Sequence, residues 1–353
     1  MKFPKLSAFF GDLIKCRKAA PRLTYAQLVE RIDNLAKENE QLKAENARLS
    51  RKGAATKSAA GAPTPVGIGQ APDFPQETPT AIADLPKSDG WLHLKASVLG
   101  FGKESLQDAH AVHTQDSSAV LIVCDGAGTK KHSKDGADFA SRFLVDRFKE
   151  RLAAGKAMKP EEWPAFSREL LLEAAVKLDA HAREAGLPLQ EFGATCIIVF
   201  ANDDFAACSH VGDGRAGYLD PKGVWRSLMV PYKGAEANAT IFLSMLKAEN
   251  ADTFIRCQVV TGRMRSIMAL SDGPENVCWH VATKPEGGGE KLIDPNIPSA
   301  KFFGKIANQL AGAAAHKVAQ EELDGFWAKF LTSGNEQLEK EVDDKTLLIA
   351  LRG

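Results

Sequence analysis

The sequence predicts an α+β fold in which two antiparallel sheets pack on each other and helices cover the outside, giving a four-layer α/β/β/α sandwich. Short apolar runs with strand-like composition cluster along the chain instead of alternating strictly with helical segments. Such clustering argues against a doubly wound parallel sheet. A few longer segments carry apolar residues at helical spacing, and these supply the outer layers. A separate helix with a heptad pattern precedes this domain.

The predicted strands and helices all follow residue 90. Strand-like runs occupy residues 91–98, 119–124, 194–200, 205–211, 216–219, 264–270 and 346–351. Helical spacing of apolar residues marks 133–152 and 163–185, and a long helical region runs from 300 to 331. His110 and His113 flank a further strand-like stretch and are expected to be packed or exposed side chains.

Residues 23–50 are predicted to form a coiled coil. A leucine recurs every seven residues, and the alternate seam positions hold an isoleucine and two asparagines: Leu28, Leu35, Leu42 and Leu49 with Ile32, Asn39 and Asn46. Asparagine at this seam position favours a parallel two-stranded arrangement. We therefore expect a homodimer through residues 23–50, and a single helix docked on the globular domain is the alternative.

The segments around this helix differ in composition. Residues 1–22 form an N-terminal segment with a few basic residues, but Pro21 interrupts the helix before the heptads, which argues against a basic DNA-binding region. Residues 51–90 are rich in Ala, Gly, Pro, Ser and Thr and are predicted to be a flexible linker. The globular domain is placed at residues 91–353.

Composition excludes several classes of partner. The formal net charge is +0, so no general attraction to nucleic acid or anionic lipid is expected. No run approaches the roughly 20 apolar residues of a membrane span, and the N-terminus is a poor signal peptide. The six cysteines are scattered and lie mostly in apolar runs, as reduced cysteines do. These observations predict a cytoplasmic protein.

Four acidic turns lie at the ends of predicted strands. Asp125 follows an apolar strand, Asp213 and Asp272 stand in Gly-Asp-Gly and Ser-Asp-Gly turns, and Asp343 with Asp344 precedes the last strand. Carboxylates gathered at one rim form a site for Mg²⁺ or Mn²⁺, because these cations prefer oxygen ligands. Each aspartate taken singly also fits an ordinary turn or helix cap.

In this order and spacing, the turns resemble the motifs of the metal-dependent serine/threonine protein phosphatases of type 2C, the PPM family. The resemblance covers residues 91–353 and rests on six segments: 107–109, 123–128, 193–195, 211–215, 269–273 and 343–349. Residues 237–243 are similar to a stretch in a bacterial subgroup of that family.

The resemblance implies a phosphatase that hydrolyses phosphoserine and phosphothreonine on proteins with a metal-activated water and two Mn²⁺ or Mg²⁺ ions. In that family pattern, Asp125 bridges the ions, the Gly126 carbonyl binds the second, and Asp272 and Asp343 bind the first. Asp213 matches a third, looser metal site, although a purely structural turn fits it equally well. Arg215 is expected to be structural.

Three positions depart from the family pattern. Gln107 replaces a glutamate, and Asp108 beside it is a further candidate ligand, directly or through water. Lys103 stands where an arginine binds phosphate, and a solvated surface lysine fits the same position. Ala127 replaces the histidine that is proposed as the general acid of the family, and we do not expect His132 to take over that role. These losses leave open a pseudo-phosphatase that binds without turnover, and a dimeric scaffold is a third possibility.

Overall fold

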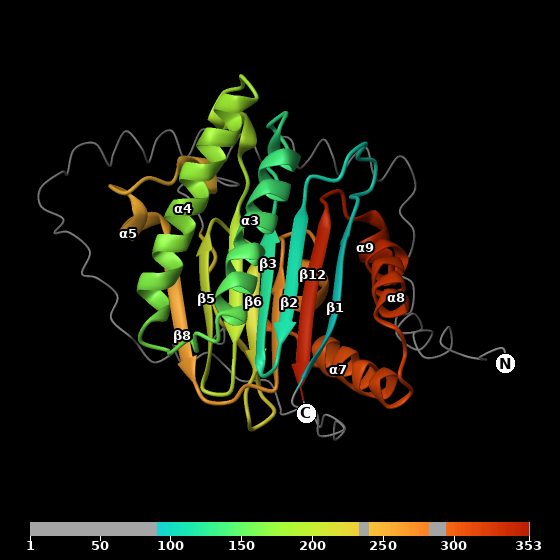
Figure 1. Ribbon diagram of the computed structural model, residues 1–353. Coiled ribbons are helices and arrows are strands. Elements are labelled where there is room, and N and C mark those ends of the chain that lie inside the picture. The colour runs from blue at the N-terminus through green and yellow to red at the C-terminus, as the bar shows by residue number, and fades with distance from the viewer. Residues whose placement is uncertain (1–89, 233–239, 282–293, 353) are drawn as a thin grey trace, which may run out of the picture. The chain divides into compact units, whose positions relative to one another are not determined.

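The computed structural model describes residues 90–232, 240–281 and 294–352, and it confirms the α+β sandwich. Within these residues the main strands form two five-stranded antiparallel sheets. Sheet 1 has the order β1-β12-β9-β6-β7, and sheet 2 has the order β2-β3-β4-β5-β8. Figure 1 shows α3 and α4 in front of one sheet and α7, α8 and α9 on the other side of the molecule.

The strands of sheet 1 come from both ends and from the middle of the domain. They are β1 (Trp91–Val98), β6 (Arg215–Leu219), β7 (Trp225–Ser227), β9 (Ser266–Leu270) and β12 (Lys345–Arg352). Those of sheet 2 are β2 (Ala109–Gln115), β3 (Ser118–Cys124), β4 (Cys196–Ala201), β5 (Phe205–Val211) and β8 (Arg256–Thr261). A separate two-stranded ribbon joins β10 (Trp279–His280) to β11 (Ile297–Pro298).

Long helices form the outer layers. The helices are α3 (Ser133–Ala153), α4 (Trp163–Glu184), α5 (Ala251–Phe254), α6 (Glu275–Cys278), α7 (Ala300–Ala315), α8 (Gln320–Ser333) and α9 (Glu336–Lys340). Two 3₁₀ turns, η1 (Leu189–Phe192) and η2 (Leu243–Met245), lie in the connections. No described helix has both the length and the apolar character that a membrane crossing requires.

Strand β3 is buried on both faces because its side chains alternate between two cores. Val120 and Ile122 belong to the core under α3 and α4, whereas Leu121 and Val123 belong to the core between the sheets. This period of two follows from strand geometry. It explains why the run is apolar at every position rather than at every second one.

The outer core of sheet 2 is aromatic. Trp163 of α4 stacks on Phe200 with 5.5 Å between ring centroids, and Phe148 of α3 packs 6.1 Å from the same tryptophan. The indole Nε1–H of Trp163 donates to Ser209 Oγ at 2.9 Å, so its buried polar group is satisfied. These contacts fix α3 and α4 on the outer face of sheet 2.

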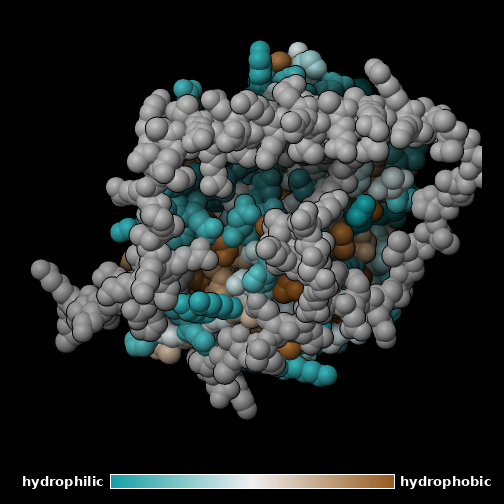
Figure 2. Space-filling view, turned by 180° about the vertical axis from the view of Figure 1, so that it is seen from behind, coloured by the Kyte–Doolittle hydropathy of each residue, from teal (hydrophilic) through white to brown (hydrophobic). Residues whose placement is uncertain are grey.

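The long helical region predicted at 300–331 is divided into α7 and α8. The chain leaves the helix after Ala315, and Lys317 takes a positive φ of 53°. Helix α8 is held against sheet 1 by Trp327, whose Nε1–H donates to the Leu347 carbonyl at 2.8 Å. Seen from behind, the described surface shows hydrophobic residues interspersed with hydrophilic ones (Figure 2).

Two strands of sheet 2 have weak sequence signals. β2 pairs with β3 but is only partly buried after its first residue, and β8 is an edge strand with exposed residues at both ends. Neither is continuously apolar. The predicted segments 1–22 and 51–90 and the coiled coil at 23–50 lie outside the described residues, Gly90 apart.

Candidate functional site

Asp125 lies where β3 leaves sheet 2. Its backbone N–H donates to Thr195 Oγ1 at 3.1 Å, and its carbonyl accepts the Thr195 N–H at 2.8 Å. Gly126 then forms an isolated antiparallel bridge with Ala194. A Cβ at Gly126 would come within 2.5 Å of the Gln107 carbonyl, so the segment bearing Gln107 can approach only a glycine here.

Asp272 and Asp343 are brought together by neighbouring strands of sheet 1. β9 ends before Asp272 and its antiparallel partner β12 begins after Asp343, so both aspartates lie at the same rim. Two hydrogen bonds of 3.1 Å, Ser271 N to Thr346 O and Thr346 N to Ser271 Oγ, extend the pairing to this rim. The site therefore combines both sheets: Asp125 from one, Asp272 and Asp343 from the other.

Asp213 lies in the turn that carries the chain from β5 in sheet 2 to β6 in sheet 1. Its neighbours Gly212 and Gly214 have φ values of 98° and 89°, a region that favours glycine. A Cβ at Gly214 would lie 2.6 Å from the Leu270 carbonyl at the end of β9. The turn is thus tightly fitted against the strand that leads to Asp272.

The predicted aspartates lie close enough for their charges to raise the pKa of Asp125 and of Asp272. Burial, and then the charges of Asp108, Asp272, Asp343 and Asp213, raise the pKa of Asp125 well above its ordinary value. Burial, followed by Asp343 and Asp213, raises that of Asp272 to about 7. Such mutual repulsion is what a bound cation would relieve.

Asp108 is a buried carboxylate that joins the motifs. Its Oδ2 accepts hydrogen bonds from Ser271 Oγ at 2.7 Å and Thr346 Oγ1 at 2.8 Å. Burial raises the pKa of Asp108 to about 6, although these hydrogen bonds lower it. Because Ser271 and Thr346 adjoin the strand ends that carry Asp272 and Asp343, Asp108 orders the rim on which those aspartates stand.

Asp344 is a site residue that the sequence alone did not identify. It is buried, and its two carboxylate oxygens accept the backbone N–H groups of Gly100 at 2.9 Å and Gln107 at 2.7 Å. It thereby fixes both ends of the loop that carries Lys103. The Gln107 side chain donates to Ser133 Oγ at 2.9 Å, at the start of α3. The available signal for Asp344 was its place directly after Asp343 and before a buried strand.

Lys103 is not an unpaired surface lysine. Its ammonium contacts Asp343 Oδ1 and lies 3.4 Å from Asp344 Oδ2. Burial lowers the pKa of Lys103, but the bond to Asp343 and the two acidic charges outweigh this and raise it. The lysine is therefore a cation held inside the acidic rim.

His132, which was considered as a replacement for the family histidine, and His110, which was expected to be packed or exposed, both have other partners. His132 interacts with Asp135 at 3.1 Å and stacks on Phe192. His110 of β2 contacts Ser97 Oγ of β1 at 2.8 Å. The position after Gly126 is Ala127, which is buried and offers no acid.

The donor set suits a hard cation. Asp272 Oδ1 is buried and has no hydrogen-bond partner among the described residues, as expected of an oxygen placed to meet an ion. As the side chains stand, however, no three acidic, histidine or cysteine side chains in the described part of the chain converge closely enough to hold a metal. Asp343 is instead bonded to Lys103.

Arg215 anchors the segment that follows Asp272, as its predicted structural role requires. Its buried guanidinium donates to Glu275 of α6 at 2.8 Å, to Asp294 at 2.8 Å and to Asn296 at 2.8 Å. An always-charged planar fork suits this shared set of acceptors. The network links the turn after β9 to the strand pair β10–β11.

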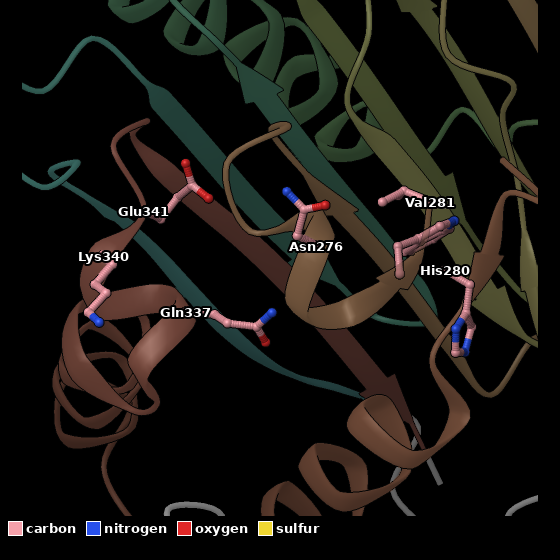
Figure 3. Close-up of a pocket in the computed structure, with 7 residues that line it drawn as sticks. Asn276, His280, Val281, Gln337, Lys340 and Glu341 are labelled. Carbon is pink, nitrogen blue, oxygen red and sulfur yellow. The ribbon is translucent and has the colours of Figure 1, made fainter. Parts of the chain in front are cut away.

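A surface hollow of about 490 Å³ lies beside this segment (Figure 3). Its residues come from α6 and β10 on one side and from α9 and the following loop on the other: Asn276, Trp279, His280, Val281, Gln337, Lys340 and Glu341. Asn276 lies four residues after Asp272, and Glu341 two residues before Asp343. The hollow thus borders both chain segments that enter the acidic rim.

Comparison with known families identifies the class of the protein. A sequence profile described as protein phosphatase 2C matches residues 102–327, more than half of the chain. The fold and the order of motifs are therefore those of a serine/threonine protein phosphatase. The chain belongs to the protein phosphatase 2C family, which confirms the resemblance found in its motifs.

Solved structures include similar chains of low identity. A bacterial serine phosphatase is 13% identical with a TM-score of 0.48, and covers 74% of this chain and 97% of its own. RsbX in complex with magnesium is 14% identical with a TM-score of 0.43, covering 76% and 99%. Stp1 from Staphylococcus aureus is 15% identical with a TM-score of 0.43, covering 80% and 100%. A search of curated protein sequences found no match.

Proposed function

We propose that this phosphatase hydrolyses phosphoserine and phosphothreonine esters on proteins by a metal-dependent mechanism without a covalent intermediate. The observation that carries the proposal is the electrostatic convergence of Asp125, Asp272, Asp343 and Asp213 at one rim shared by the two sheets. Buried carboxylates that repel one another are costly unless a cation compensates them.

The donor set assigns roles by position. Asp125 with the Gly126 carbonyl, Asp272 and Asp343 would hold two Mn²⁺ or Mg²⁺ ions, and Asp213 would serve a third. Two such ions supply Lewis acidity and an activated water when bound. Asp108 positions the strand ends and would contribute to the ions at most through Oδ1, because Oδ2 is occupied by Ser271 and Thr346.

Lys103 would hold the substrate phosphate as a point charge. Its ammonium is fixed at the rim by Asp343 and Asp344, and the backbone that carries it is tied down by Asp344. An ammonium lacks the bidentate fork of an arginine, so it attracts phosphate without fixing its orientation. Orientation then depends on the ions and on the surrounding protein surface.

The proposal extends to the arrangement of the chain. We propose a cytoplasmic homodimer, formed through residues 23–50 and tethered by 51–90, which acts on phosphoproteins and binds neither nucleic acid nor membrane. Heptad leucines, the two seam asparagines and a net charge of +0 support this arrangement.

Turnover of a small aryl phosphate and of a phosphothreonine peptide by the purified full chain tests the mechanism. Activity should need Mn²⁺ or Mg²⁺ and disappear with EDTA. Asp125→Asn and Asp272→Asn should each reduce kcat by several orders of magnitude, because an amide cannot compensate the metal charge. Asp146→Asn is the matched control, since Asp146 is an exposed aspartate of α3 paired only locally with Lys149. Metal-independent turnover would refute the mechanism, and no turnover at all would favour the pseudo-phosphatase.

A further inference from the structure

Exposed hydrophobic side chains gather next to the acidic rim. Among the described residues, Leu99, Phe101 and Val342 are large hydrophobic side chains left exposed, and Phe101 and Val342 are each 65% exposed. We call these three residues the Phe101 patch. A phenylalanine ring exposed to this extent lacks the favourable free energy that most phenylalanines gain from burial.

The two loops that form the Phe101 patch are fixed to each other. The Phe101 N–H donates to the Glu341 carbonyl at 2.7 Å. Gly100 is so close to the second loop that a Cβ there would lie 2.3 Å from the Val342 carbonyl oxygen. The backbones that carry the patch are therefore held in defined positions relative to each other.

The same two loops carry the candidate chemistry. Lys103 follows Phe101 by two residues, and Asp343 follows Val342 directly, and these two polar side chains contact each other. Along both loops the hydrophobic side chains are exposed while the neighbouring charged ones meet at the rim. Phe101 and Gly102 are the central residues of a turn that the Lys103 N–H closes by donating to the Gly100 carbonyl at 3.2 Å. The backbone of Phe101 therefore lies at most about 7 Å from that of Lys103.

We propose that the Phe101 patch binds an apolar side chain within three residues of the phosphorylated serine or threonine of a protein substrate. This rests on the proposed function. A phosphopeptide whose phosphate meets Lys103 spans roughly 10 Å over three residues on either side, which is far enough to reach the loops that bear Phe101 and Val342. An apolar substrate side chain placed there buries surface that the patch otherwise leaves in water, which favours such substrates over polar ones.

Two matched sets of phosphopeptides test this inference on the full chain with Mn²⁺. In one set leucine, and in the other serine, occupies each of the three positions on both sides of the phosphoserine in turn. For at least one position, wild type should show a kcat/KM ratio of leucine to serine of about five- to tenfold, as expected for a partly buried leucine. Phe101→Ser and Val342→Ser should each bring this ratio close to one.

A control separates the patch from general effects. Val176 is a comparably exposed hydrophobic residue, at 67%, on α4. Val176→Ser should keep the wild-type leucine preference. Melting temperatures of all three variants should match that of wild type, because the substituted side chains are exposed.

The outcomes are distinguishable. No hydrolysis of a small aryl phosphate or of any peptide by wild type would overturn the proposed function and this inference together. Hydrolysis of the aryl phosphate with equal rates on both peptide sets would overturn the inference alone. A leucine preference that survives both Phe101→Ser and Val342→Ser would also overturn it. An equal rise in the rates on the leucine and serine peptides in Phe101→Ser and Val342→Ser would also overturn the inference. It would mean that residues 1–89 or a second copy of the chain cover the patch.

Discussion

The Lys103 ammonium contacts the carboxylate of Asp343, so a cation of the protein itself lies against a residue proposed to bind a metal ion. Asp344 Oδ2 lies 3.4 Å from the same ammonium. A metal ion at this rim would therefore have to share Asp343 with Lys103 or displace the Lys103 ammonium. Positive charge at this rim is useful for phosphate and unfavourable for Mn²⁺.

Replacing Lys103 by methionine should separate these two effects. Without the ammonium, Mn²⁺ affinity should rise by up to about fivefold, since partly exposed ion pairs contribute about 1 kcal/mol or less. KM for a phosphopeptide should increase more than kcat falls if the lysine only holds phosphate. Calorimetric titration with Mn²⁺ and steady-state kinetics measure both quantities. Lys149→Met on α3 is the control, and an unchanged or weaker Mn²⁺ affinity in Lys103→Met would contradict the shared-ligand view.

Neutralising Asp272 should stabilise the metal-free protein. Asp272 is mostly buried, is repelled by Asp343 and Asp213, and has an oxygen without a partner among the described residues. Asp272→Asn should therefore raise Tm in EDTA by a few degrees, because about 1 kcal/mol corresponds to roughly 2–4 °C in a domain of this size. In excess Mn²⁺ the order should reverse, because wild type gains binding free energy. Scanning calorimetry in both buffers, with Asp146→Asn as control, measures this; a lower Tm in EDTA would contradict it.

The buried His210 should make stability fall in weak acid. Burial first, and then the charge of Arg256, lower its pKa to about 4 despite the hydrogen bond to the Gly212 carbonyl. The unfolded chain binds a proton at about pH 6.5, so the unfolded state holds more protons between pH 6.5 and pH 4. As the pH falls through this window, the free energy of unfolding should drop by at most about 3 kcal/mol. Above pH 6.5, His210 should have no effect on it.

Chemical denaturation at several pH values measures this dependence. His210→Gln should remove most of the drop attributed to His210, because glutamine keeps a donor for the Gly212 carbonyl but does not titrate. His316→Gln, at an exposed position after α7, serves as the control. Equal pH profiles for wild type and His210→Gln would show that other groups govern acid stability.

The coiled-coil prediction concerns residues outside the described part of the chain and is tested in solution. Proline at both Leu35 and Leu42 should interrupt the helix and give a monomer, because proline removes a helical hydrogen bond and clashes with the preceding turn. Turnover on a small aryl phosphate should be retained. Light scattering at tens of micromolar compares the two proteins, and a monomeric wild type would refute the dimer.

The buried strands and the order of motifs were predictable because burial leaves a direct trace in composition. Residues 205–211 match β5 at both ends, since every position is buried and all but His210 are apolar or small. β8 was missed because an edge strand has half its surface in water and loses the apolar pattern. The break between α7 and α8 was missed because the positive φ falls on a lysine, which gives no signal of a turn.

Candidate site residues were predicted from motifs, while their partners required the fold. The gathering of Asp125, Asp272 and Asp343 at one rim was expected from carboxylates at strand ends. The pairing of Lys103 with Asp343 joins segments about 240 residues apart, and no local pattern reports such a contact. For the same reason the sequence left open whether Lys103 was an ordinary solvated lysine.

The distribution of the site over both sheets has a consequence for genetics. Asp125 leaves sheet 2 and Asp272 leaves sheet 1, so their separation depends on how the sheets pack through residues such as Val199 and Leu348 in the shared core. A random screen for loss of phosphatase activity should therefore recover substitutions at these core positions. Such alleles would resemble active-site lesions in an activity assay although the altered side chains touch neither ion nor substrate, and suppressors restoring core volume would lie on the opposite sheet.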